Sequence, residues 1–83
     1  MTRKKHGEIL WSEPISVKVG TEEHCGHLTV YYVDASKCAY SVDYNLTQHK
    51  GPGVFDHGQT ETIRAFALGD LATLARGERP YPD

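Results

Sequence analysis

The segment from residue 27 to residue 33 constrains the fold more than any other part of the sequence, because it carries large apolar side chains at consecutive positions. In an extended strand, neighbouring side chains point to opposite faces of the sheet. Bulky groups therefore lie on both faces of this segment, with Leu28, Val30 and Tyr32 on one and Tyr31 and Val33 on the other. A single helix can cover only one face of a small sheet, so the second face needs another cover.

The loop that follows this strand decides which of its two faces joins the core. The next predicted strand spans residues 38–46 and carries Tyr40 near its start. If the loop consists of the four residues 34–37, Tyr31 lies opposite Tyr40, and directly opposed residues share a face. A loop with an odd number of residues reverses this assignment, because a shift of one residue exchanges the faces. The even-numbered residues of the first strand then join Tyr40 in the core, and Tyr31 and Val33 lie outside.

The second face has several candidate covers. The N-terminal segment around Trp11 could fold over it, one tyrosine could stay exposed, or a second copy of the chain or another protein could bind there. The last two options lead to a functional hypothesis: a non-catalytic binding or regulatory module that acts by protein–protein contact through its sheet, alone or as a homodimer. The residues expected at this contact are Trp11, Tyr31, Tyr32 and Val33.

The complete pattern predicts one small α+β domain over residues 1–83, with an antiparallel sheet of three to four strands in a meander. One main C-terminal helix is expected to pack on one face of that sheet. Strand signals cover residues 7–11, 15–19, 27–33 and 38–46. Ser12-Glu13-Pro14 is expected to separate the first two strands, because proline cannot donate a hydrogen bond to a central ladder.

The sequence pattern predicts a loop followed by a helix in the C-terminal half of the chain. Glycine and proline mark residues 47–58 as the loop. Apolar residues at helical spacing predict the helix over residues 60–76, with Gly77 as its C-terminal cap. We expect a frayed N-terminus over residues 1–6 and an extended tail over residues 78–83.

Charge and composition argue against several classes of protein. The chain has 9 Lys and Arg against 11 Asp and Glu, a net charge of −2, whereas nucleic-acid binders usually carry a basic surplus. No apolar run approaches the roughly 20 residues that a membrane helix needs. No apolar signal segment follows the basic start, so we expect a cytoplasmic chain with reduced thiols. One disulfide between Cys25 and Cys38 remains an alternative.

The cluster His24-Cys25-Gly26-His27 is the strongest candidate for chemistry. Zinc takes four Cys or His ligands in tetrahedral geometry, so His24, Cys25 and His27 give a second hypothesis, a metal- or small-ligand-binding protein with zinc as the cofactor. The alternative is that these are ordinary turn and strand-end residues, with Cys25 as a small buried hydrophobe and no cofactor at all.

Signals for catalysis are weak. Cys25 with a neighbouring histidine, and Asp43 or Asp56 to orient it, could form a nucleophilic site. However, the sequence contains no nucleophile elbow, phosphate-binding loop or dinucleotide fingerprint. We therefore favour a protein that is not an enzyme and predict no catalytic residue.

One passage has a family resemblance. Residues 52–61 read Pro52-Gly53-Val54-Phe55-Asp56-His57-Gly58-Gln59-Thr60-Glu61. This passage resembles the one that leads into the helix of HicB-type antitoxins. The resemblance implies a β-β-β-α partial ribonuclease H-like fold and a module that binds a small partner protein, the toxin.

Overall fold

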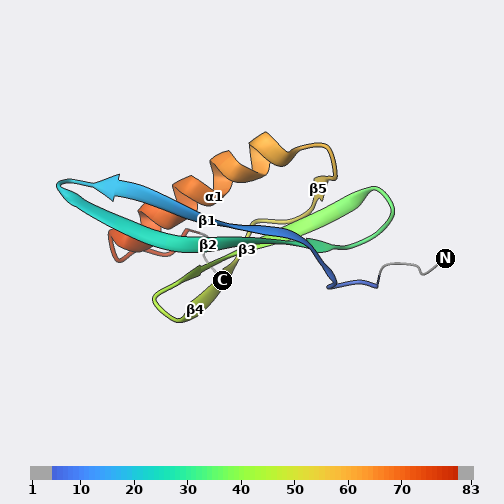
Figure 1. Ribbon diagram of the computed structural model, residues 1–83, viewed down its shortest axis with the longest axis horizontal. Coiled ribbons are helices and arrows are strands. Elements are labelled where there is room, and N and C mark those ends of the chain that lie inside the picture. The colour runs from blue at the N-terminus through green and yellow to red at the C-terminus, as the bar shows by residue number, and fades with distance from the viewer. Residues whose placement is uncertain (1–4, 81–83) are drawn as a thin grey trace.

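The computed structural model describes residues 5–80 and shows two layers, an antiparallel sheet with one helix on one of its faces (Figure 1). The strands follow the order β1-β2-β3-β4, and β5 pairs with β3 beside that path. The elements are β1 (Ile9–Val19), β2 (Glu22–Tyr32), β3 (Lys37–Tyr44), β4 (Thr47–Lys50), β5 (Phe55–Asp56) and α1 (Thr60–Ala75). The predicted α+β fold with an antiparallel meander and one C-terminal helix is confirmed. Residues 1–4 and 81–83 of the expected frayed start and tail lie outside the described residues.

The first two predicted strands are one continuous strand, β1, and the expected interruption at residues 12–14 is wrong. Val19 and Glu22 close a two-residue turn, so they form a hydrogen-bonded pair, and such pairs alternate along the ladder. Pro14 therefore falls at a position whose backbone nitrogen faces the free edge of the sheet. Because β1 is an edge strand, the missing N–H costs no ladder bond.

The predicted loop over residues 47–58 contains two short strands that the prediction missed. β4 folds back on β3 through a two-residue turn at Asn45 and Leu46, whose φ angles are 56° and 66°. Positive φ at both central residues defines a type I′ turn, which matches the twist of the flanking strands. Glycine is the favoured second residue of this turn, so Leu46 is unusual there.

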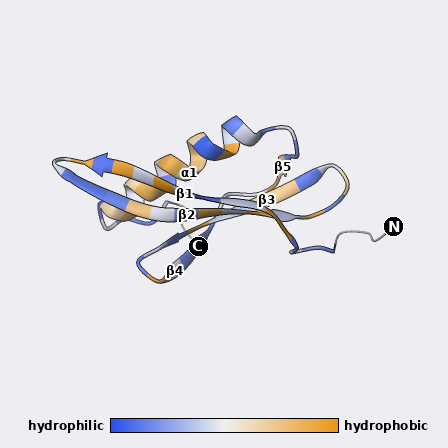
Figure 2. Cartoon of the chain, viewed as in Figure 1, coloured by the Kyte–Doolittle hydropathy of each residue, from blue (hydrophilic) through white to orange (hydrophobic). Residues whose placement is uncertain are grey.

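The register between β2 and β3 resolves the question of the two faces. Tyr32 lies opposite Cys38, which leaves a loop of five residues, 33–37. The odd loop puts Val30 opposite Tyr40, on the face that α1 covers. Figure 2 shows β2 changing from hydrophilic near the β1–β2 turn to hydrophobic in the middle of the sheet. The sheet and α1 together bury Ile15, Leu28, Val30, Cys38, Tyr40, Val42, Ile63, Ala67 and Leu71.

Helix α1 packs through Ile63, Ala67 and Leu71, one residue per turn. It ends at Ala75, and Gly77 follows as the predicted C-terminal cap with a φ of 83°. The N–H of Gly77 donates to the carbonyl of Leu74, and the N–H of Glu78 donates to that of Thr73, the two bonds of a Schellman cap. No helix among residues 5–80 has the length and apolar character needed to cross a membrane.

A buried polar contact ties α1 to the centre of the sheet. The hydroxyl of Tyr40 donates to a carboxylate oxygen of Asp70 at 2.6 Å, and both residues are buried. Gly51 lies against the same tyrosine ring, and a Cβ atom there would stand 2.5 Å from a ring carbon. The ring of Tyr40 therefore sets how closely the chain after β4 can approach β3.

Replacing Leu46 with glycine should stabilise the fold. Left-handed backbone costs an L-residue about 1–2 kcal/mol, and glycine loses about 0.5–1 kcal/mol in conformational entropy. We expect Leu46→Gly to raise the free energy of unfolding of the monomeric chain by roughly 0.5–1 kcal/mol in a urea titration at low protein concentration. A loss of stability would contradict the turn geometry.

Two glycines near the end of β4 should respond differently to alanine. Gly51→Ala forces a Cβ into the Tyr40 ring and should cost about 1–3 kcal/mol of stability. Gly53→Ala meets nothing within 4 Å and should leave stability unchanged or raise it by up to about 1 kcal/mol. Urea titration of both variants tests the pair, and equal effects would show that Tyr40 does not approach Gly51.

Candidate functional site

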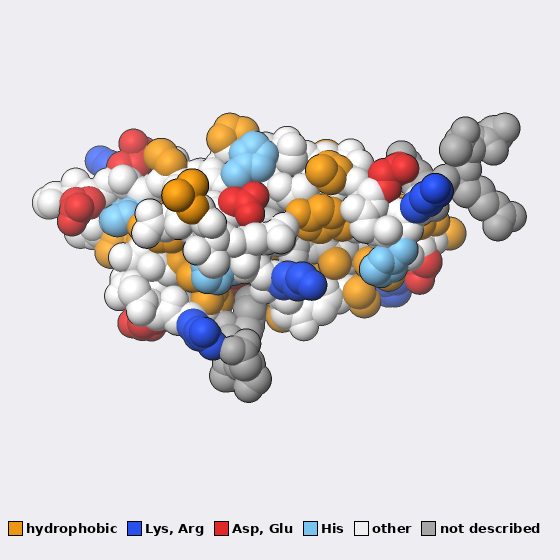
Figure 3. All heavy atoms as spheres, turned by 90° about the horizontal axis from the view of Figure 1, so that it is seen from below, with side chains coloured by type: hydrophobic (Ala, Val, Ile, Leu, Met, Phe, Trp, Pro, Cys, Tyr) orange, Lys and Arg blue, Asp and Glu red, His pale blue; other side chains and the backbone are white. Residues whose placement is uncertain are grey.

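The face of the sheet away from α1 is the candidate site, and we call it the open face. The strand registers define its members. They are Ser12, Pro14, Ser16 and Lys18 from β1, Glu23, Cys25, His27, Thr29 and Tyr31 from β2, Val33 just after it, Ala39, Ser41 and Asp43 from β3, and Gln48 and Lys50 from β4. Figure 3 views the molecule from this side and shows hydrophobic side chains gathered on the half nearer the N-terminus, beside cationic and histidine side chains.

A groove of about 520 Å³ lies on this half of the open face. The surface is recessed here because Ala39 and Ser41 have small side chains and because residues 51 and 53 are glycines. Tyr31, Val33 and Val54 contribute its apolar lining. Tyr31 and Val33 are half-buried and Val54 is 56% exposed, so among residues 5–80 nothing seals this groove.

A polar cluster lies at the groove and fixes the ring of Tyr31. The amide nitrogen of Gln48 donates to the Tyr31 hydroxyl at 2.6 Å and to the hydroxyl of Ser41 at 2.9 Å. The Ser41 hydroxyl also donates to Tyr31, at 3.1 Å. The Tyr31 oxygen thus accepts two hydrogen bonds, and its own hydrogen remains available to a bound group. Sequence reasoning missed Ser41 and Gln48, because their roles depend on the unpredicted β4.

A lysine and a histidine side chain border the groove. Lys50 and His6 line it, and both are exposed. Asp43 lies further along the same face, opposite His27 and Gln48 in the ladders. Within the described part of the chain, neither Lys50 nor Asp43 has an ion-pair partner. The open face therefore carries an unpaired positive charge at the groove and an unpaired negative charge away from it.

Two of the four expected contact residues lie on the face that α1 covers. Trp11 lies opposite Val30 and packs at the core, with the guanidinium of Arg64 5.2 Å from its ring centre. A β-bulge at Leu10 precedes it. Tyr32 lies opposite the buried Cys38. Strand alternation puts these two residues on the other face from Tyr31 and Val33. Tyr32 nevertheless lines the groove together with Tyr31 and Val33, whereas Trp11 does not.

Residues 5–11, the described part of the N-terminal segment, do not close the open face. Ile9 lies opposite Tyr31 at the start of β1, yet it is 58% exposed. Before it, the N–H of Gly7 donates to the carbonyl of Tyr32, and the N–H of Tyr32 donates to that of Glu8. These bonds hold the segment along the edge of β2, where Gly7 lines one side of the groove.

The three residues expected to bind zinc do not converge. His24 faces the α1 side, where its ring nitrogen is 3.0 Å from the Tyr44 hydroxyl. Cys25 and His27 alternate to the open face. No group of three His, Cys, Asp or Glu side chains among residues 5–80 is arranged to hold a metal ion. The geometry gives the zinc hypothesis no support.

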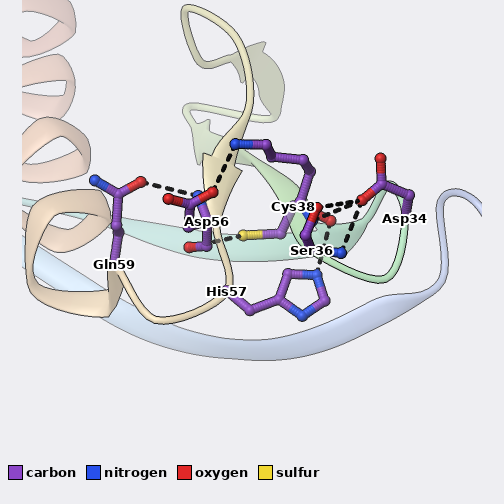
Figure 4. A network of polar contacts seen from close by, with 7 residues as sticks. Asp34, Ser36, Cys38, Asp56, His57 and Gln59 are labelled. Atoms are coloured by element: carbon purple, nitrogen blue, oxygen red, sulfur yellow. Dashed lines mark hydrogen bonds and ion pairs between the residues drawn. The ribbon is translucent and has the colours of Figure 1, made fainter.

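A second polar cluster closes the β2–β3 loop onto β5 (Figure 4). The carboxylate of Asp34 accepts hydrogen bonds from the backbone N–H groups of Ser36 and Lys37, each at 2.8 Å. The bond from Ser36 lowers the pKa of this carboxyl. Lys37 forms an ion pair with Asp56 at 2.6 Å, and the ring of His57 is 2.8 Å from the Lys37 carbonyl oxygen. The charges of Asp34, Lys37 and Asp56 therefore all make contacts that hold the five-residue loop 33–37 in place.

The thiol within this second cluster is not activated. Cys38 is buried, and its sulfur lies 3.9 Å from the carbonyl oxygen of Asp56 (Figure 4). Burial raises the pKa of the Cys38 thiol, and the negative charge of Asp56 raises it further. A nucleophilic cysteine needs the opposite shift. Cys25 is exposed, and both cysteines are free thiols, so the alternative of a disulfide is not realised.

Comparison of the chain with protein-family models, with curated proteins and with solved structures gave no significant match.

The two thiols should react at very different rates with iodoacetamide. Cys25 is exposed and should be alkylated first, whereas Cys38 is buried and stays protonated until the fold opens. Mass spectrometry should show one fast addition per chain and a second that appears on adding denaturant. A Cys25→Ser variant should lose the fast addition. Two equally fast additions would show that Cys38 is accessible.

Proposed function

We propose that this protein is a small non-catalytic binding module that acts by protein–protein contact on the open face. The observation that carries the proposal is the groove around Tyr31 and Val33, which none of the described residues covers. Contiguous apolar surface with a polar rim is typical of protein interaction sites. A tyrosine that is held by two hydrogen bonds is a good anchor, because little rotational freedom is lost on binding.

The edges of the sheet are less suited to binding than its face. Pro14 stands in the middle of the long edge strand β1, where a further strand would need its N–H. The opposite edge strand, β4, has only 4 residues. An incoming strand would lose a hydrogen bond at Pro14 on one edge and would find only a short partner on the other. Contact through side chains of the open face remains the better route.

The apolar wall and the hydrogen-bond donors of the groove indicate what kind of partner surface would bind there. The groove wall is apolar, and the groups that can still donate hydrogen bonds are the Tyr31 hydroxyl and the Lys50 ammonium. A protruding apolar side chain with an acceptor or a carboxylate beside it would satisfy both. Such a group is common on protein surfaces.

Site-specific photo-cross-linking inside cells tests the proposal. A benzophenone amino acid replaces Tyr31 in one variant and Phe66, which is 45% exposed on α1, in the matched control. We expect a covalent protein adduct from position 31 and much less from position 66, whether the captured chain is a second copy or a different protein.

Adducts from position 66 alone, or from neither position, would contradict the assignment of the open face as the binding surface. Circular dichroism of each purified variant confirms that its fold is intact before cross-linking yields are compared.

A further inference from the structure

Leu46 at the tip of the β3–β4 hairpin is the most exposed large hydrophobic residue of the described chain, with a relative exposure of 107%. Its φ of 66° is a conformation that side-chain-bearing residues seldom adopt. The fold itself gains nothing from a leucine here, since the turn prefers glycine. Leu46 thus combines a costly backbone conformation with a fully exposed apolar side chain. This combination suggests that Leu46 contacts another molecule.

The hairpin that carries Leu46 extends to the side of the sheet opposite α1 (Figure 1). The groove lies on the same side, lined by Tyr31, Val33 and Val54. Its volume of about 520 Å³ is ample for a leucine side chain. One face of the molecule therefore carries both an apolar projection and an apolar recess.

Two charged side chains of this face lie beside the projection and the recess. Asp43 lies on β3 close to the hairpin tip, and Lys50 and His6 lie at the groove. Asp43 and Lys50 have no ion-pair partner among the described residues. A hairpin that entered the groove of another molecule would bring its Asp43 towards the Lys50 ammonium of that molecule.

We infer that the open face binds a second copy of this chain, with Leu46 of each protomer inserted into the groove of its partner. The inference rests on the proposed function and names the partner. A projection and a matching recess on one face satisfy the condition for a two-fold dimer, in which each contact occurs twice. Asp43 of one protomer then faces Lys50 of the other.

Sedimentation velocity on the purified chain, from micromolar to millimolar concentration, measures the association directly. The wild-type protein should form a dimer of twice the 9.3 kDa chain mass. Leu46→Gly should raise the dimer Kd by at least about a hundredfold, because each dimer loses two buried leucines. The fold should remain intact, since glycine suits the turn.

Matched variants separate a specific contact from a general effect. Leu68→Gln removes an exposed hydrophobic residue from α1, outside the open face, and should change the Kd by no more than about twofold. Val54→Glu places a negative charge in the groove wall, where it repels the incoming Asp43, and should also weaken the dimer.

Mixing the two weakened variants gives the sharpest test. Leu46→Gly keeps an intact groove and Val54→Glu keeps an intact projection, so their heterodimer retains one of the two contacts. The mixture should associate more tightly than either variant alone. Equal association of the mixture and the single variants would overturn the inference.

A wild-type chain that stays monomeric at millimolar concentration would also overturn it. That result would leave the proposed function standing if position 31 still forms an adduct with a different protein in cells. Dimerisation that Leu46→Gly does not weaken would mean that copies associate through another surface.

Discussion

The pairing of Tyr32 with Cys38 is the constraint on which the rest of the structure depends. It leaves five residues in the β2–β3 loop, and the odd number places Val30 and Tyr40 on one face. The loop is held at this length by Asp34, which accepts hydrogen bonds from the backbone after it, and by the ion pair between Lys37 and Asp56. A surface cluster thus determines which side chains α1 buries.

On the other side of β2, where Thr29 is buried and Tyr31 half-buried, residues 5–80 form no second layer. A chain with one helix of 16 residues can bury one face of its sheet, and the buried leucine, valine and tyrosine side chains take that face. On the opposite face the small residues Ala39 and Ser41 form a recess beside Tyr31. The candidate site is therefore a consequence of strand parity and of side-chain size.

Much of this architecture could be predicted from the sequence, and the failures have physical causes. The strand around Val30 and the helix capped by Gly77 were predictable from periodicity and capping. The face of Tyr31 was not, because loop parity depends on contacts between Lys37 and the distant Asp56. β4 was missed because its four residues, Thr47–Lys50, are all polar, and it exists through pairing with β3. Asp70 lies within the apolar stripe of α1, which was an available signal for its buried bond to Tyr40.

Nuclear Overhauser contacts in the protein's NMR spectrum test the central assignment of faces most directly. The methyl groups of Leu28 and Val30 should show contacts to those of Ile63 and Leu71 in α1. The ring of Tyr31 should show contacts to Ser41 and Gln48 and none to α1. Contacts between the Tyr31 ring and the α1 methyl groups would mean that the register is shifted by one residue and that the open face is on the other side.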